Sequence, residues 1–131
     1  MKTRTGLLSL LVVFALTSCA NIYKFPVSNV TPAANIEYRQ QRDKNGNNQI
    51  TIKAENLAAV ERLSPPKAVY VVWILTENSD TRNLGQLRNK NAQLAEIQTL
   101  TPYKYTDIFI TAEEQADVLY PTGVEISRLK F

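Results

Sequence analysis

Alternating apolar and polar residues run through most of this chain. Residues 36–41 and 50–55 each place their least polar side chains at every second position. A period of two puts those side chains on one face of an extended strand. Residues 43–48 (DKNGNN) separate the two runs, and their Asn-Gly pair is a common hairpin turn. The pattern therefore predicts an antiparallel hairpin with one face toward a core and one toward water.

The turn between these strands also has a second interpretation. Asp43, Asn45 and Asn47 are spaced like the first ligands of a calcium-binding loop. Such a loop has Gly at its sixth position and Glu at its twelfth, where this chain has Asn48 and Ala54. The hairpin turn is therefore the preferred interpretation, and no metal site is predicted.

Residues 68–75 (AVYVVWIL) are apolar at every position and follow Pro65 and Pro66. A run of this length, rich in β-branched and aromatic residues, predicts a strand that is covered on both faces. The preceding prolines block a helix or a central strand at their own positions. Trp73 could stack on a ligand, but a lone Trp inside such a strand more often fills the core.

Four further strands are predicted toward the end of the chain, over residues 82–88, 92–100, 105–112 and 124–131. The second of these also fits two helical turns, and we choose strand. Residues 113–117 are interpreted as a polar loop or a single helical turn. About seven short strands without a long helix predict an all-β fold, a single antiparallel β-sandwich of the immunoglobulin-like kind.

The first 18 residues follow a different pattern. Lys2 and Arg4 precede residues 6–16, which are apolar apart from Ser9. About 20 apolar residues are needed to span a bilayer, so this run favours a signal peptide over a transmembrane helix. The sequence Leu-Thr-Ser-Cys at residues 16–19 closes the run and resembles the lipobox of bacterial lipoproteins. The resemblance implies cleavage before Cys19, acylation of that cysteine and attachment to a membrane through lipid.

The residues after Cys19 bear on location and on domain boundaries. The second mature position is Ala20 and not the Asp that resembles an inner-membrane retention signal, which favours the outer membrane. No acidic cluster resembling a surface-export signal follows, which favours the periplasmic face.

Residues 20–34 form either a tether or, around Phe25 and Val27, a first edge strand. We expect a signal peptide at residues 1–18, a lipidated terminus and tether at 19–34, and the β-sandwich at 35–131.

Composition narrows the chemistry. The chain has no His, and its single Cys is the proposed lipid site. These counts exclude an intrachain disulfide, a His or Cys zinc site and catalytic triads that use an imidazole base, so we expect no cofactor. Two of the 15 basic residues, Lys2 and Arg4, belong to the signal, so the others exceed the 12 acidic residues by one. Without a cluster of basic and aromatic residues, this balance argues against nucleic-acid binding.

A second resemblance covers about residues 65–131. Residues 70–75 (YVVWIL) after Pro65-Pro66, and residues 109–113 (FITAE) followed by 121–123 (PTG), are similar to the extracytoplasmic C-terminal domain of the anti-sigma-K factor family. That family joins the domain to a zinc-binding intracellular part through a transmembrane helix. A lipobox stands in that place here, so direct sigma-factor inhibition is not expected. We interpret the motifs structurally, with Trp73 in the core and Glu113 binding backbone or cationic groups.

Three functions are compatible with these observations. The first is a non-catalytic lipoprotein of the cell envelope that presents a surface to another envelope protein or a glycan. Its candidate contact residues are Tyr103, Lys104, Tyr105 and Tyr120. The second is an extracytoplasmic sensor or regulatory module, as the anti-sigma resemblance implies. The third is a hydrolase that uses carboxylates alone, pairing Asp107 with Glu125 or Glu113. The missing catalytic groups favour the first, which is not an enzyme.

Overall fold

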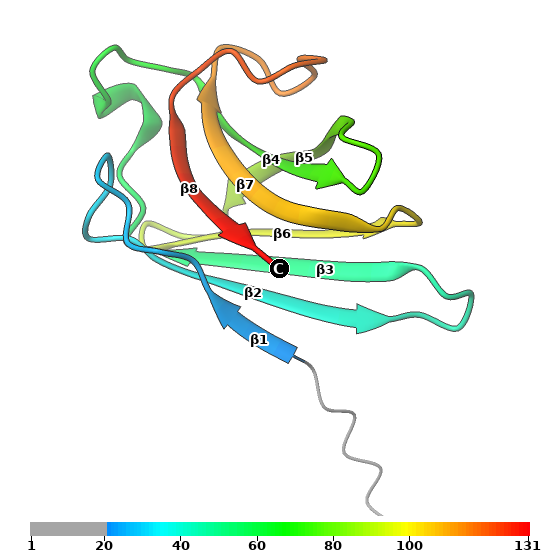
Figure 1. Ribbon diagram of the computed structural model, residues 1–131. Helices are drawn as coiled ribbons and strands as arrows, with labels where there is room; N and C mark the ends of the chain where they lie inside the picture. The colour runs from blue at the N-terminus through cyan, green and yellow to red at the C-terminus, as the bar shows by residue number, and fades with distance from the viewer. Residues whose placement is uncertain (1–20) are drawn as a thin grey trace, which may run out of the picture.

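Eight antiparallel strands and one short helical turn make up residues 21–131, the part of the chain described by this computed structural model (Figure 1). The strands are β1 (Asn21–Lys24), β2 (Asn35–Arg42), β3 (Asn48–Glu55), β4 (Val69–Thr76), β5 (Thr81–Asn89), β6 (Leu94–Thr101), β7 (Tyr105–Glu113) and β8 (Glu125–Lys130). The turn is the 3-10 helix η1 (Val60–Arg62). The all-β prediction is confirmed.

The strands lie in the order β1-β2-β3-β6-β5-β4-β7-β8, in one sheet that folds over itself into two layers (Figure 1). The layers are joined where Arg88 and Asn89 of β5 pair with Glu96 and Ala95 of β6. From β2 to β8 the order of neighbours is that of the seven strands in an immunoglobulin constant-type sandwich. One difference is that β5 pairs mainly with β4. The predicted sandwich is confirmed, and β1 is an eighth strand at its edge.

The main core lies between the two layers and follows from the predicted alternation. Tyr38 of β2 pairs with Ile52 of β3, and both side chains are fully buried. Val72 and Ile74 of β4 approach them from the other layer, together with Ile110 of β7. The opposite face of β2, β3 and β6 is polar, with Arg39, Gln49, Thr51 and Gln98 among its side chains. One face of this layer is therefore dry and the other wet.

β4 is covered on both faces, as its unbroken apolar run predicts. Val71 and Trp73 point away from the main core and pack with Phe109 of β7 in a second buried cluster. The Trp73 and Phe109 rings stack with their centroids 6.3 Å apart. Val118, in the connection between β7 and β8, packs against the outside of this cluster. Trp73 is therefore a core residue and not an exposed platform for a ligand.

The ambiguous segments are also resolved. Residues 94–101 are strand β6, so the choice of strand over helix was right. The β2–β3 connection is a tight turn in which the Asp43 carboxylate accepts hydrogen bonds from the backbone N–H groups of Asn45 and Asn47. Residues 114–124 form a loop between β7 and β8. Within residues 21–131, no helix has the length and hydrophobicity needed to cross a membrane.

Residues 21–34 require a correction, because they belong to the folded domain. β1 pairs along its whole length with β2, from Asn21 opposite Gln40 to Lys24 opposite Glu37. Phe25 then enters the main core, and the Ser127 hydroxyl donates to the Pro26 carbonyl at 2.7 Å. Of the two alternatives, the edge strand is right, although it lies just before Phe25. The domain boundary expected at residue 35 is therefore wrong.

The Phe25→Ala variant tests this assignment. Truncating a buried Phe side chain to Ala typically destabilises a protein by about 3 kcal/mol. We therefore expect the free energy of unfolding to fall by about that amount. Trp73, the only Trp of the chain, reports the transition by fluorescence in a denaturant titration. Val27→Ala is the control, since Val27 is 75% exposed. Equal stability of the two variants would show that residues 21–34 do not contribute to the core.

Candidate binding surface

The predicted contact residues do not all lie together. Cys19, the predicted lipidation site, lies outside the described residues. Tyr105 packs against the main core, and its hydroxyl hydrogen-bonds to that of Tyr38. The Phe131 ring lies edge-on to that of Tyr105, with the centroids 5.8 Å apart, and burial raises the pKa of Tyr105. Tyr105 is therefore half-buried and held against the core, unlike the exposed Tyr103 and Tyr120.

Tyr103 and Lys104 are exposed on the short connection between β6 and β7. The Arg82 guanidinium lies over the Tyr103 ring, 4.7 Å from its centroid. The Lys104 carbonyl accepts a hydrogen bond from the Glu77 backbone N–H at 3.2 Å, which fixes this connection to the β4–β5 turn. The Tyr103 ring is thereby held beside a cation at the start of β5.

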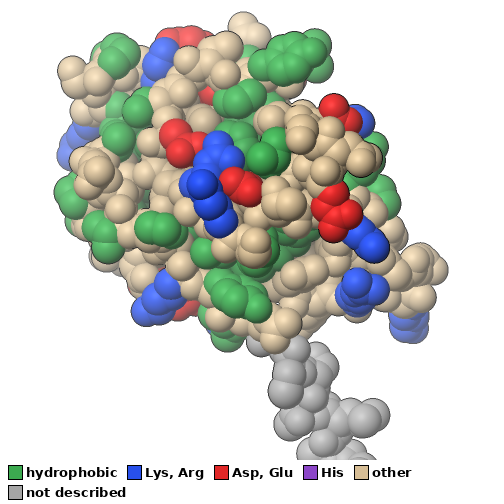
Figure 2. All heavy atoms as spheres, viewed as in Figure 1, with side chains coloured by type: hydrophobic (Ala, Val, Ile, Leu, Met, Phe, Trp, Pro, Cys, Tyr) green, Lys and Arg blue, Asp and Glu red, His purple; other side chains and the backbone are tan. Residues whose placement is uncertain are grey.

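Tyr120 lies on the β7–β8 loop next to an apolar residue that the sequence analysis did not select. Leu119 is 80% exposed and Tyr120 is 72% exposed. Because the two residues are adjacent, they form a contiguous exposed apolar patch, which is a candidate contact for a binding partner. On the face shown in Figure 2, hydrophobic side chains lie among charged groups of both signs, with no broad patch of one sign.

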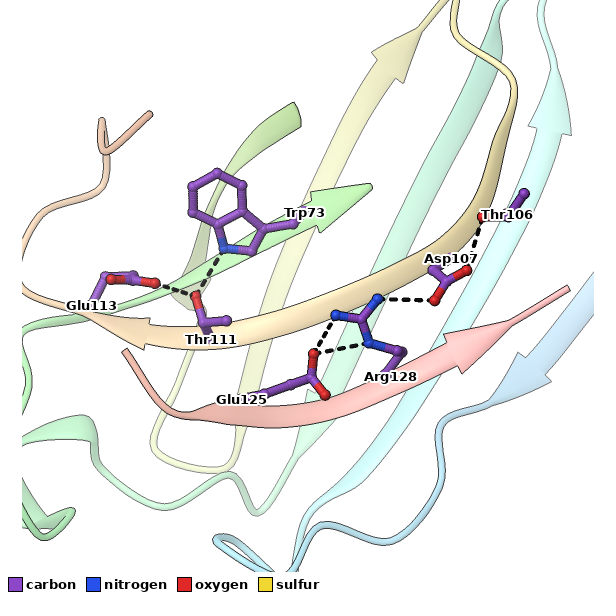
Figure 3. A network of polar contacts seen from close by, with 7 residues as sticks. All are labelled: Trp73, Thr106, Asp107, Thr111, Glu113, Glu125 and Arg128. Atoms are coloured by element: carbon purple, nitrogen blue, oxygen red, sulfur yellow. Dashed lines mark hydrogen bonds and ion pairs between the residues drawn. The ribbon is translucent and has the colours of Figure 1, made fainter. Parts of the chain in front are cut away.

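The β7–β8 loop is held at its carboxyl-terminal end by a buried carboxylate. Glu113 is fully buried and accepts hydrogen bonds from the Thr122 hydroxyl at 2.7 Å and the Gly123 backbone N–H at 3.1 Å. It also accepts from the Thr111 hydroxyl at 2.6 Å, which in turn accepts from the Trp73 indole N–H (Figure 3). Burial alone would raise the pKa of Glu113, but these hydrogen bonds together lower it. An ionised carboxylate therefore joins the loop to the Trp73 cluster.

A second clamp holds the first half of the loop. The Asn83 side-chain amide of β5 donates to the carbonyls of Ala116 and Val118, at 2.8 and 2.9 Å. Its side-chain oxygen accepts from the Gly85 backbone N–H at 2.8 Å, which fixes the orientation of the amide. Leu119 and Tyr120 therefore lie between two clamped points.

An open groove of about 610 Å³ lies between the loop and the start of β5. Its lining residues are Ser79, Asp80, Thr81, Arg82, Asn83, Leu119 and Tyr120. Arg82 links the two predicted tyrosines, since it stacks on Tyr103 and lines the same groove as Tyr120. We call Arg82, Tyr103, Leu119 and Tyr120 the loop–groove surface.

The carboxylates considered for hydrolysis are tied to other groups. Arg128 donates to Asp107 at 2.9 Å and to Glu125 at 2.9 Å (Figure 3). Its guanidinium also lies over the Phe109 ring, 3.9 Å from the ring centroid. Burial would raise the pKa of Asp107, but hydrogen bonds from Arg128 and Thr106 lower it. A hydrolase that relies on two carboxylates needs one of them protonated near neutral pH. The pKa values of Asp107 and Glu113 shift in the opposite direction.

No known family model, curated protein or solved structure matches this chain. The resemblance to the anti-sigma-K factor family therefore stays a prediction.

The sequence did not identify three residues that line the groove, Arg82, Asn83 and Leu119. The adjacent pair Leu119-Tyr120 within an otherwise polar loop was a usable signal, because such residues are costly to expose. Arg82 and Asn83 carried no signal, since their partners are distant in sequence. The Asn83 amide reaches Val118, 35 residues away.

The Glu113→Gln variant tests the clamp. The introduced amide NH₂ would face backbone N–H donors, so we expect the free energy of unfolding to fall by about 2 kcal/mol. The control is Glu114→Gln, which removes only an exposed ion pair with Lys67 and is expected to cost less than about 1 kcal/mol. Equal losses in a denaturant titration would contradict a special role for Glu113.

The lowered pKa of Glu113 predicts that the stability difference between wild type and Glu113→Gln depends on pH. The folded-state pKa of Glu113 lies below its unfolded value of about 4.3. Its stabilisation is therefore complete above about pH 5 and is lost as the pH falls through the folded-state value. The stability difference between wild type and Glu113→Gln should shrink below about pH 4. A difference that stays constant down to acid unfolding would show that Glu113 is not ionised in the folded state.

Proposed function

We propose that this chain is a non-catalytic lipoprotein of the bacterial cell envelope. Lipid on Cys19 holds it at the outer membrane, facing the periplasm, and the loop–groove surface binds another envelope protein. The observation that supports binding most strongly is the exposure of Leu119 and Tyr120 on a loop that is clamped on both sides.

Anchoring is supported by the sequence. The apolar run and Leu-Thr-Ser-Cys at residues 16–19 have the order of a lipoprotein signal. Each buried methylene of an acyl chain contributes about 0.8 kcal/mol, so two or more chains attach a protein stably where one is marginal.

Partner binding is supported by residue type and by rigidity. Tyr and Arg, together with Trp, are enriched at binding hot spots, and the loop–groove surface contains both Tyr and Arg. The clamps from Glu113 and Asn83 fix the loop before a partner arrives, which lowers the entropic cost of binding. An exposed Leu offers no hydrogen bond to a sugar, but it adds apolar area to a protein interface. We therefore favour a protein over a glycan.

The anchor is tested by Cys19→Ala. We expect the variant to lose its acyl chains, measured by mass spectrometry, and to leave the membrane fraction. Ser18→Ala is the matched control, because a small residue before the cysteine preserves the lipobox. A Cys19→Ala protein that still fractionates with membranes would contradict lipid anchoring.

Binding is tested by site-specific photocrosslinking in intact cells. A crosslinker at position 120 should capture one recurring envelope protein, while one at position 27, which is equally exposed but remote, should not. A carboxylate buried without a partner in an apolar contact costs about 2 kcal/mol or more, so Leu119→Asp should reduce the product by roughly tenfold or more. Absence of a product, or the same products from both positions, would contradict the proposed surface. Enrichment of polysaccharide instead would favour a glycan ligand.

A further inference from the structure

We propose that the end of the sandwich where β1 begins rests directly on the phospholipid headgroups. This inference depends on the proposed lipid anchor at Cys19, but it goes beyond the anchor because it assigns protein side chains to the membrane surface. The contact surface consists of the start of β1, the β2–β3 turn, the β6–β7 connection and Phe131. We call it the β1 end.

The length of chain between lipid and domain leaves little room for a tether. Cys19 is only two residues before Asn21, where β1 begins. Even a fully extended chain spans at most about 3.6 Å per residue, so the two Cα atoms are no more than roughly 7 Å apart. Acyl chains on Cys19 would therefore hold the first residues of β1 at the level of the headgroups.

The strand register shows which other segments lie at this end. Asn21 pairs with Gln40, so the end of β2 and the turn at residues 43–47 lie beside the start of β1. Asn48 pairs with Thr101, which places the β6–β7 connection there too. The Phe131 backbone N–H donates to the Thr106 carbonyl at 2.9 Å. The Phe131 ring lies 5.7 Å from that of Tyr23 in β1 and 5.2 Å from that of Tyr38 in β2, which places the chain terminus marked C in Figure 1 beside these strands.

Apolar and aromatic side chains are exposed around the start of β1. Ile22 is 52% exposed and Phe131 is 53% exposed. Tyr23 is 43% exposed, and its ring lies edge-on to that of Phe131, with their centroids 5.7 Å apart. Aromatic side chains with an apolar body and a polar tip are favoured at the interface between membrane and water. A membrane surface would cover these groups, which are otherwise left in water.

The charges near the β1 end suit anionic headgroups. Its exposed basic residues are Arg42, Lys44, Lys104 and Lys130, and none of these forms an ion pair within residues 21–131. The acidic residues of the same region are Asp43, Glu77, Asp80 and Asp107. Asp43 is engaged by its own turn, Asp80 pairs with Arg82, and Asp107, opposite Lys130 in the sheet, pairs with Arg128. Each Lys or Arg near an anionic membrane contributes about 1 kcal/mol.

The loops at the opposite end carry a balanced set of charges. Their basic residues are Arg62, Lys67 and Lys90, and their acidic residues are Glu61, Glu114 and Asp117. The asymmetry orients the domain with its β1 end toward the lipid. Ser79 and Asp80 of the groove belong to the β4–β5 turn, which is hydrogen-bonded to the β6–β7 connection. A partner at the loop–groove surface would therefore bind close to the membrane.

The test uses the full acylated protein in vesicles of phosphatidylethanolamine and phosphatidylglycerol. The only native Cys is the proposed lipid site, so an introduced cysteine is the one free thiol for an environment-sensitive fluorophore. Labels at Ile22→Cys and Asn45→Cys should shift to the blue and be quenched by a headgroup-level lipid quencher. A label at Val27→Cys, on an exposed residue away from this end, should show neither effect.

Mass spectrometry of the same samples separates the two proposals. Acylated protein with quenching at positions 22 and 45 but not 27 supports the contact. Acylated protein with equal, aqueous signals at all three positions overturns the contact and leaves the anchor standing. Protein without acyl chains overturns the anchor and, with it, the contact.

A second measurement reverses the charge of exposed lysines, which leaves the buried core unchanged. Lys44→Glu combined with Lys104→Glu should reduce quenching at position 22 at least about twofold, since two favourable headgroup contacts become repulsive. Arg62→Glu, at the opposite end, should leave quenching unchanged. Equal quenching in all three proteins would show that the basic residues of the β1 end do not contact lipid.

Discussion

The hydrogen bonds of the buried Glu113 carboxylate hold the β7–β8 loop over the Trp73 cluster, and the rest of the outer face of β4 and β7 depends on them. A charge removed from water is tolerated only when hydrogen bonds replace its hydration. Glu113 obtains them from Thr111, Thr122 and Gly123, and so it can lie at the end of β7 while holding the returning β7–β8 loop. The loop passes so close to β7 that a Cβ atom on residue 123 would lie 1.5 Å from the Ala112 carbonyl oxygen. Only glycine fits there, which explains why the turn combines a hydroxyl residue with a glycine.

The clamped β7–β8 loop contributes both to the core and to the proposed binding surface. Val118 covers the cluster of Trp73 and Phe109, which would otherwise be an exposed apolar face of β4 and β7. The same segment places Leu119 and Tyr120 in solvent, beside Arg82. Core and surface residues thus alternate along one short loop, and the hydrogen bonds that protect the core also limit the conformations of the surface. A partner would meet a surface that is largely formed in advance.

The position of β1 close to Cys19 would restrict the orientation of the domain on the membrane. A flexible tether would let the domain turn freely above the bilayer, whereas a strand that begins two residues after Cys19 would fix one end of the sandwich near the lipid. The immunoglobulin-like strand order from β2 to β8 is complete without β1. This strand therefore adds an edge beside the proposed lipid attachment point, and it carries Ile22 and Tyr23 to that end.

The sequence by itself determined the all-β class, the hairpin of β2 and β3 and the burial of β4 on both faces, because alternation and turn residues act over a few neighbouring positions. The proposed membrane address also rests on a short contiguous motif. Only the tertiary structure decided that residues 21–34 join the domain, that Tyr105 packs inward, and that Arg82 and Asn83 meet the tyrosine-bearing loops. Those contacts join segments far apart in the chain, and their geometry depends on the layer order and the path of each loop, which local patterns do not encode.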